Sequence, residues 1–119
     1  MKFVRNLLLL FVSFLLMVSF DGTGKKMPSV NLKDLNGKVV NIQDHATNGK
    51  LTVISFWATW CTPCKRELDA FTDFEEEWAE EYNAEIVAIT IDNARQLAKV
   101  KPMVAQKGWG FTVLSDVKQ

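Results

Sequence analysis

Apolar and polar positions divide the chain into segments with two different periods. Residues 29–34 and 38–43 alternate partly between apolar and polar side chains and flank an Asn36-Gly37 pair. This pattern predicts a β-hairpin, because both residues of the pair tolerate positive φ. Continuous apolar and β-branched runs predict three further strands, at residues 51–57, 85–91 and 111–114. The first of these runs has the composition of a central strand that is covered on both faces.

Between the predicted strands, apolar residues recur every three to four positions, and residues 64–82 are therefore predicted to form a helix. Its apolar stripe is expected to consist of Leu68, Phe71, Phe74 or Glu75, Trp78 and Tyr82. Asp92 or Asn93 is expected to cap a second helix. Pro102 should kink or divide that helix, and Gly108 should end it. Its inward-facing residues are expected to be Ala94, Leu97, Ala98 and Val104.

The order of the elements is a hairpin followed by alternating strands and helices. Such alternation predicts an α/β fold with a parallel sheet and right-handed crossovers. Residues 28–119 are long enough for one such domain, and the polar, glycine-containing residues 21–27 are predicted to be a linker.

The first twenty residues form a unit of their own. Lys2 and Arg5 precede an apolar run at residues 7–20, which is shorter than the roughly 20 residues that span a bilayer. Residues 1–20 are therefore interpreted as a signal peptide or a retained N-terminal membrane anchor, and a buried helix is the alternative. Both exported interpretations place the domain outside the cytoplasm.

Composition excludes several classes of function. The whole chain has fourteen Lys and Arg and fourteen Asp and Glu, so its net charge is zero. Without residues 1–20 it has twelve positive and fourteen negative charges, which gives a net charge of −2. A nucleic-acid-binding surface is not expected, because it needs a basic excess or a basic stripe. Two cysteines are too few for a scaffold held together by disulfides.

Both cysteines lie in one motif, Trp60-Cys61-Thr62-Pro63-Cys64, where a predicted strand meets a predicted helix. The first turn of a helix has unpaired N–H groups and a partial positive charge, which lower a thiol pKa below the ~8.5 of a free thiol. Cys61 is therefore interpreted as the exposed nucleophile and Cys64, one turn inside, as the resolving thiol. Pro63 suits the first helical turn, and Trp60 is expected to shield the sulfurs.

Other interpretations of the two cysteines are weaker. A structural disulfide would close too small a loop to stabilise the fold much. Zinc needs four ligands, and His45 is the only histidine of the chain. His45 is interpreted as a solvated residue of a polar loop at 44–50. Covalent haem attachment requires a histidine where this chain has Lys65. A redox-active dithiol is the favoured interpretation, with no metal and no cofactor other than the Cys61–Cys64 disulfide itself.

Residues 54–67, ISFWATWCTPCKRE, resemble the active-site segment of thioredoxin-fold proteins, most closely the TlpA/ResA-like branch of exported thiol–disulfide oxidoreductases. The resemblance extends over about residues 27–119. It implies a thioredoxin-like fold and the reduction of disulfides in exported partner proteins, often apocytochromes during c-type cytochrome assembly. It also implies a membrane thiol reductase as electron donor and a location in the periplasm or at the extracytoplasmic face of a bacterial membrane.

The chain departs from the family pattern at two places. Ser55 stands where classical thioredoxins carry a buried Asp, whereas Glu67 matches a carboxylate of the ResA-like branch and is expected to accept the proton of Cys64. An ordinary surface Glu is the alternative for Glu67. The family's cis-proline loop, closing β-hairpin and final helix have no counterpart before Gln119, so the domain is expected to be incomplete, with an unpaired apolar edge on strand 51–57.

Two other functions stay open at this point. One is a peroxiredoxin-type thiol peroxidase, although the residues before Cys61 lack the Pro-x-x-x-Thr-x-x-Cys setting. The other is an inactive, truncated thioredoxin-like binding module.

Overall fold

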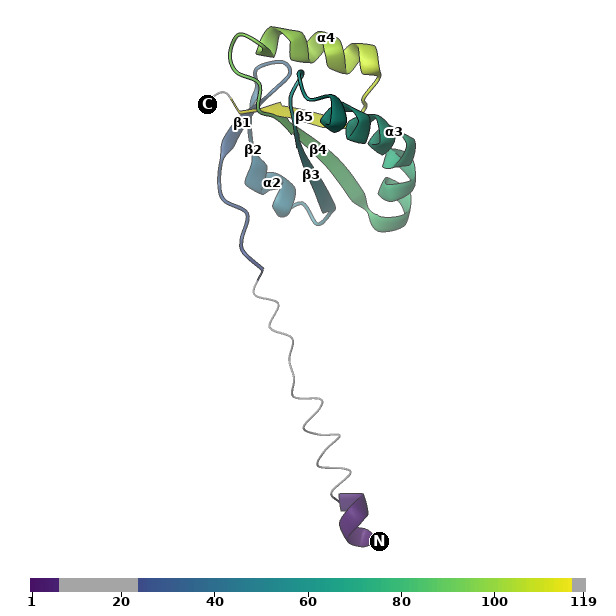
Figure 1. Ribbon diagram of the computed structural model, residues 1–119. Helices are drawn as coiled ribbons and strands as arrows, with labels where there is room; N and C mark the ends of the chain where they lie inside the picture. Colours follow the sequence, from purple (N-terminus) through teal and green to yellow (C-terminus); the bar gives the residue numbers. More distant parts are fainter. Residues whose placement is uncertain (7–23, 117–119) are drawn as a thin grey trace.

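A computed structural model describes residues 1–6 and 24–116 (Figure 1). The apolar run at residues 7–20, on which the prediction of a signal peptide or anchor rests, lies outside the described residues, as do residues 21–23 of the predicted linker. Within the described ranges, no helix combines the length and the apolar character that a membrane crossing requires.

The described domain is built on one mixed sheet of five strands. They are β1 (Asn31–Asp34), β2 (Val39–Asn41), β3 (Leu51–Trp57), β4 (Ala84–Thr90) and β5 (Thr112–Ser115). Their order across the sheet is β2-β1-β5-β4-β3. β3, β4 and β5 run parallel to one another, and β1 is antiparallel to both β2 and β5. The predicted α/β architecture is confirmed, with the hairpin adding an antiparallel part to the parallel sheet.

The predicted hairpin forms around Asn36-Gly37. Gly37 has a φ of 82°, and the Asp34 carboxylate accepts hydrogen bonds from the N–H groups of Asn36 and Lys38. The second strand ends earlier than predicted, because the side chain of Asn41 accepts a hydrogen bond from the Gln43 N–H and starts the short helix α2 (Ile42–Ala46).

The prediction of a central, doubly covered strand at 51–57 is wrong for the described part of the chain. β3 lies at the edge of the sheet and pairs only with β4. Leu51 and Phe56 are 60% and 63% exposed. The apolar composition of residues 51–57 predicted a strand with apolar surroundings. Composition alone does not show whether another strand pairs with each of its two edges. The expected unpaired edge of this strand is confirmed within residues 24–116.

Two helices pack on one face of the sheet, α3 (Thr62–Tyr82) and α4 (Leu97–Lys107). The core between them and the strands includes Trp57 from β3, Leu68 from α3 and Val104 from α4. A second cluster, on the α2 side, comprises Leu32, Ile42, Val87, Ile89 and Leu114. The helix predicted from residue 64 is confirmed, although of its predicted stripe only Leu68 is fully buried.

Helix α4 differs from its prediction in three ways. It starts at Leu97, because Asn93 accepts hydrogen bonds within the preceding turn, and Ala94 and Ala98 are exposed. It continues through Pro102 as one helix. The ring leaves the Ala98 carbonyl without its usual N–H partner, which costs least at an exposed position where water can bond to it. Gly108, with a φ of 68°, ends the helix as predicted.

Candidate functional site

The two cysteines lie at the connection between β3 and α3, as the sequence predicted. Cys61 is the residue that immediately precedes α3, and Pro63 occupies the first turn. The Cys61 N–H donates to the Ala58 carbonyl at 3.0 Å, which closes the turn between strand and helix. Cys61 and Cys64 are joined by a disulfide, with their Cα atoms 5.4 Å apart.

The positive end of α3 is available to these sulfurs. No side chain at Cys61 caps the first turn of the helix by a hydrogen bond. The first N–H groups of the helix therefore keep their partial positive charge, which favours a thiolate at this position after reduction. The location of both cysteines at the start of the helix is as predicted, and the lowered pKa of the Cys61 thiol stays a prediction.

The motif is open to solvent on one side and packed on the other. Thr62 and Pro63 are exposed, and Trp60 is 61% exposed. Cys61 and Cys64 are half-buried, and Cys64 packs against the core cluster that contains Leu68. Cys64, but not Cys61, is thus among the residues packed on the core, whereas the assignment of Cys61 as the exposed nucleophile and Cys64 as the resolving thiol stays a prediction. Shielding of the sulfurs by Trp60 stays a prediction.

Glu67 and Ser55, the two residues singled out by the family pattern, lie together. The Ser55 hydroxyl donates to Glu67 Oε2 at 3.4 Å, joining the buried strand residue to the exposed helix residue. The Glu67 carboxylate thus extends over the position at which classical thioredoxins carry an Asp. Its role as proton acceptor for Cys64 stays a prediction.

Asp92 is a residue at this end of the sheet that sequence reasoning assigned to helix capping. It is 0% exposed and does not cap α4. Its carboxylate accepts hydrogen bonds from the N–H and the hydroxyl of Thr59 and from the hydroxyl of Thr90. The signal that could have found it is its position just after a buried strand, at the carboxyl edge of the parallel sheet, where functional residues gather.

His45 is not a solvated loop residue, which corrects the sequence interpretation. It lies on α2, its side chain is 16% exposed, and its Nδ1 is 2.9 Å from Glu85 Oε1. Thr52, at the start of β3, donates its hydroxyl to the His45 carbonyl, so the histidine lies at the opposite end of that strand from Cys61. A zinc site made of His45 and both cysteines of one chain is therefore ruled out. In residues 1–6 and 24–116, no three His, Cys, Asp or Glu side chains form a group suited to a metal ion.

The Glu85 carboxylate accepts several hydrogen bonds at the end of the sheet opposite the cysteines. Burial raises the pKa of its carboxyl, but hydrogen bonds from Asn48, His45 and Thr52 outweigh that effect and lower the pKa below 4.5. The cluster ties α2 and the loop after it to the starts of β3 and β4.

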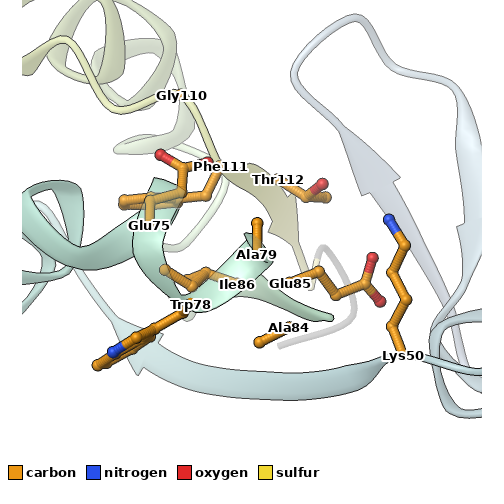
Figure 2. A pocket seen from close by; sticks show the side chains of 10 residues that line it. All are labelled: Lys50, Glu75, Trp78, Ala79, Ala84, Glu85, Ile86, Gly110, Phe111 and Thr112. Carbon is orange, nitrogen blue, oxygen red and sulfur yellow. The ribbon is translucent and has the colours of Figure 1, made fainter. Parts of the chain in front are cut away.

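A pocket of about 270 Å³ lies between α3 and the starts of β4 and β5. Figure 2 shows that Lys50 and Glu85 lie at one side of it and that Glu75 reaches toward Gly110. A Cβ atom at Gly110 would lie 3.3 Å from Glu75 Oε2, so glycine leaves room for this carboxylate. The pocket lining includes neither cysteine nor Glu67, and the pocket is therefore separate from the redox motif.

Residues 23–119 match the protein-family model described as the AhpC/TSA family. The chain belongs to the AhpC/TSA family. Among curated members of similar sequence, the "Thioredoxin-like protein YneN" of Bacillus subtilis is 32% identical over 96 residues, covering 80% of this chain and 54% of the relative. The "Thiol-disulfide oxidoreductase ResA" of Bacillus anthracis is 33% identical, covering 81% of this chain and 53% of the relative. This AhpC/TSA chain therefore spans about half the length of the curated relatives that it matches.

Solved structures support the fold of this AhpC/TSA-family chain. A thioredoxin-like protein from Porphyromonas gingivalis superimposes with a TM-score of 0.67 at 38% identity, covering 78% of this chain and 61% of the other. A putative thiol:disulfide interchange protein DsbE from Chlorobium tepidum gives a TM-score of 0.66 at 27% identity, covering 80% and 63%. The predicted thioredoxin-like fold and the resemblance to ResA-like proteins are both confirmed.

Proposed function

We propose that this chain is an exported thiol–disulfide oxidoreductase that reduces disulfides in partner proteins through Cys61 and Cys64. The observation that carries the proposal is the Cys61–Cys64 disulfide at the N-terminus of α3, where the Cys61 side chain makes no capping hydrogen bond. This placement stabilises a thiolate, which is the nucleophile in thiol–disulfide exchange.

The reaction starts from the reduced pair. The Cys61 thiolate attacks one sulfur of a partner disulfide, forms a mixed disulfide and releases the partner's other sulfur as a thiolate. Cys64 loses its proton and attacks the Cys61 sulfur, which restores the Cys61–Cys64 disulfide and releases the second partner thiolate. Two electrons pass to the partner, and its two thiolates take up the protons that the two cysteines lost.

Glu67 is proposed to receive the proton of Cys64. It lies one turn further along α3, on the side where the Ser55 hydroxyl donates to it. An exposed carboxylate that accepts a hydrogen bond from a neutral hydroxyl can exchange protons with solvent after each turnover.

The partners and the location are part of the same proposal. The basic residues and apolar run of residues 1–20 support export, as a cleaved signal or as an anchor. The partners are proposed to be disulfide-bearing exported proteins, including apocytochromes of the c type. A membrane thiol reductase is proposed to return electrons to the pair. Periplasmic or extracytoplasmic placement follows from export in a bacterium.

A trapping experiment tests the function. In a Cys64→Ser variant the resolving step is lost, so a mixed disulfide between Cys61 and a disulfide-containing peptide should accumulate and be visible by mass spectrometry under non-reducing conditions. A Cys61→Ser variant, which retains the inner thiol, is the control and should trap little. Absence of any adduct on Cys61 in the first variant would refute the proposal.

Two further measurements separate the alternatives. Consumption of hydrogen peroxide by the reduced chain, at a rate above that of free dithiol, would favour a thiol peroxidase instead. Failure of residues 21–119 to unfold cooperatively, as followed by circular dichroism, would favour an inactive product.

A further inference from the structure

The buried carboxylate of Asp92 is held entirely by neutral groups. Thr59 donates to it twice, through its N–H at 2.9 Å and through its hydroxyl at 2.8 Å, and the Thr90 hydroxyl donates to it once. No lysine, arginine or histidine makes an ion pair with it among the described residues. Burying a carboxylate without a cationic partner is costly, and these three hydrogen bonds offset part of that cost.

The carboxylate connects the end of β4 to the turn that carries the dithiol. Thr59 is two residues before Cys61, and both of its donors reach the same side chain, which fixes its backbone and its side chain together. The turn is also held at its base, where the Ile91 N–H donates to the Trp57 carbonyl at 2.9 Å. Thr59 lies inside the turn that the hydrogen bond from the Cys61 N–H to the Ala58 carbonyl closes.

We propose that Asp92 is a positioning residue for the dithiol. By holding Thr59, it fixes the turn at residues 58–61 and thereby keeps the Cys61 sulfur at the N-terminus of α3. This inference rests on the proposed function, in which Cys61 reacts as a thiolate. The influence of a helix end falls off within its first turn, so a small displacement of the sulfur reduces the stabilisation of the thiolate.

The proposal predicts a particular direction of change. Thr59→Val removes the hydroxyl donor and keeps the Asp92 carboxylate in place. If Asp92 positions the turn, this variant should raise the pKa of the Cys61 thiol toward the free-thiol value. If Asp92 acted on the thiol only through its charge, the variant would leave that pKa unchanged.

The chain offers a closely matched control at the other end of the same strand pair. Thr52 donates its hydroxyl to the Glu85 carboxylate at 2.9 Å, as Thr59 does to Asp92. Thr52→Val therefore removes a hydroxyl beside a carboxylate between the same two strands, together with its contact to the His45 carbonyl, far from the cysteines. Thr59→Ser retains the hydroxyl and is the conservative rescue.

The experiment measures alkylation of Cys61 by iodoacetamide across a pH series, in the reduced full chain, with the modified cysteine identified by mass spectrometry. Thr59→Val is expected to shift the midpoint upward by roughly one pH unit, equivalent to about tenfold slower alkylation below the midpoint. Thr59→Ser and Thr52→Val are expected to retain the midpoint of the unaltered chain. Should Thr59→Val fail to fold, Thr90→Val loosens Asp92 from its other side and is expected to shift the midpoint in the same direction.

Two results would overturn the inference: a Thr59→Val midpoint equal to that of the unaltered chain, or an equal shift in Thr52→Val. The trapping experiment is independent of this one. A chain that traps no partner but shows the Thr59→Val shift would refute the proposed function and support the positioning role. A chain that traps a partner but shows no shift would do the reverse.

Discussion

Replacing Leu68 by alanine tests whether α3 is anchored to the sheet as described. Leu68 is fully buried, one turn beyond Cys64, and packs in the same cluster as Trp57 and Val100. The replacement removes three carbon atoms and leaves a cavity between a strand and two helices that cannot easily close. Such replacements cost about 2–5 kcal/mol, and the complete burial of Leu68 places the expected loss at about 3–4 kcal/mol of unfolding free energy.

The assay is urea unfolding of the oxidised chain, followed by circular dichroism. Leu51→Ala is the matched control, because the same atoms are removed from a side chain that is mostly exposed on β3. This control is expected to cost less than about 1 kcal/mol, since little buried surface is lost. Leu68→Met, which nearly conserves volume, should cost less than about 1.5 kcal/mol.

Equal losses for Leu68→Ala and Leu51→Ala would refute the packing that places α3 on this face of the sheet. A loss for Leu68→Ala below about 1 kcal/mol would also contradict it, because a cavity of this size cannot form in a packed core without cost.

Two further predictions concern charge and backbone. Because the pKa of Glu85 is lower in the folded chain than the unfolded value near 4.5, its hydrogen-bonded carboxylate stabilises the fold above that pH and the contribution is lost as the pH falls through the folded pKa. In urea unfolding between pH 7 and 3, Glu85→Gln should therefore lose less stability on acidification than the unaltered chain. The control Glu76→Gln, at an exposed site of α3, should lose as much stability as the unaltered chain. A loss of stability in Glu85→Gln as large as that of the unaltered chain would contradict this prediction. Gly108→Ala should cost about 1–2 kcal/mol, because Gly108 has a left-handed φ of 68° although nothing lies within 4 Å of an added Cβ. Gly24→Ala, in equally open space without such a φ, should be neutral in thermal unfolding, and equal melting temperatures for the two variants would show that backbone strain is not the cause.

Local patterns in the sequence predicted most element positions. The strand predicted at 51–57 is β3, with the same bounds. The helix predicted at 64–82 and the strand predicted at 85–91 differ from α3 and β4 by one or two residues at their ends. These elements are defined by the period and type of their own residues. The position of β3 at the sheet edge depends on pairing with other segments, which no local pattern contains.

The site was predictable to a similar extent. Cys61 and Cys64 are only three positions apart, and this spacing is typical of a redox-active pair, so the motif could be found without a structure. Asp92 and Thr59 are separated by 33 residues and meet only because β3 and β4 pair in parallel. His45 and Glu85 were missed as partners for the same reason, since a polar segment with one histidine resembles an ordinary loop until α2 forms beside the sheet.

The edge position of β3 also has a dynamic consequence. The dithiol turn follows directly from the outermost strand, which one ladder of backbone hydrogen bonds joins to the rest of the sheet in the described domain. Detaching this strand and the turn therefore breaks fewer contacts than unfolding the whole domain, and local opening of this kind has a lower free energy than global unfolding. Amide hydrogen exchange should accordingly be faster in β3 than in β4, which is paired on both sides. β3 can thus open transiently while the remainder of the sheet stays intact, and the bonds from Thr59 to Asp92 limit the movement of the turn that follows it.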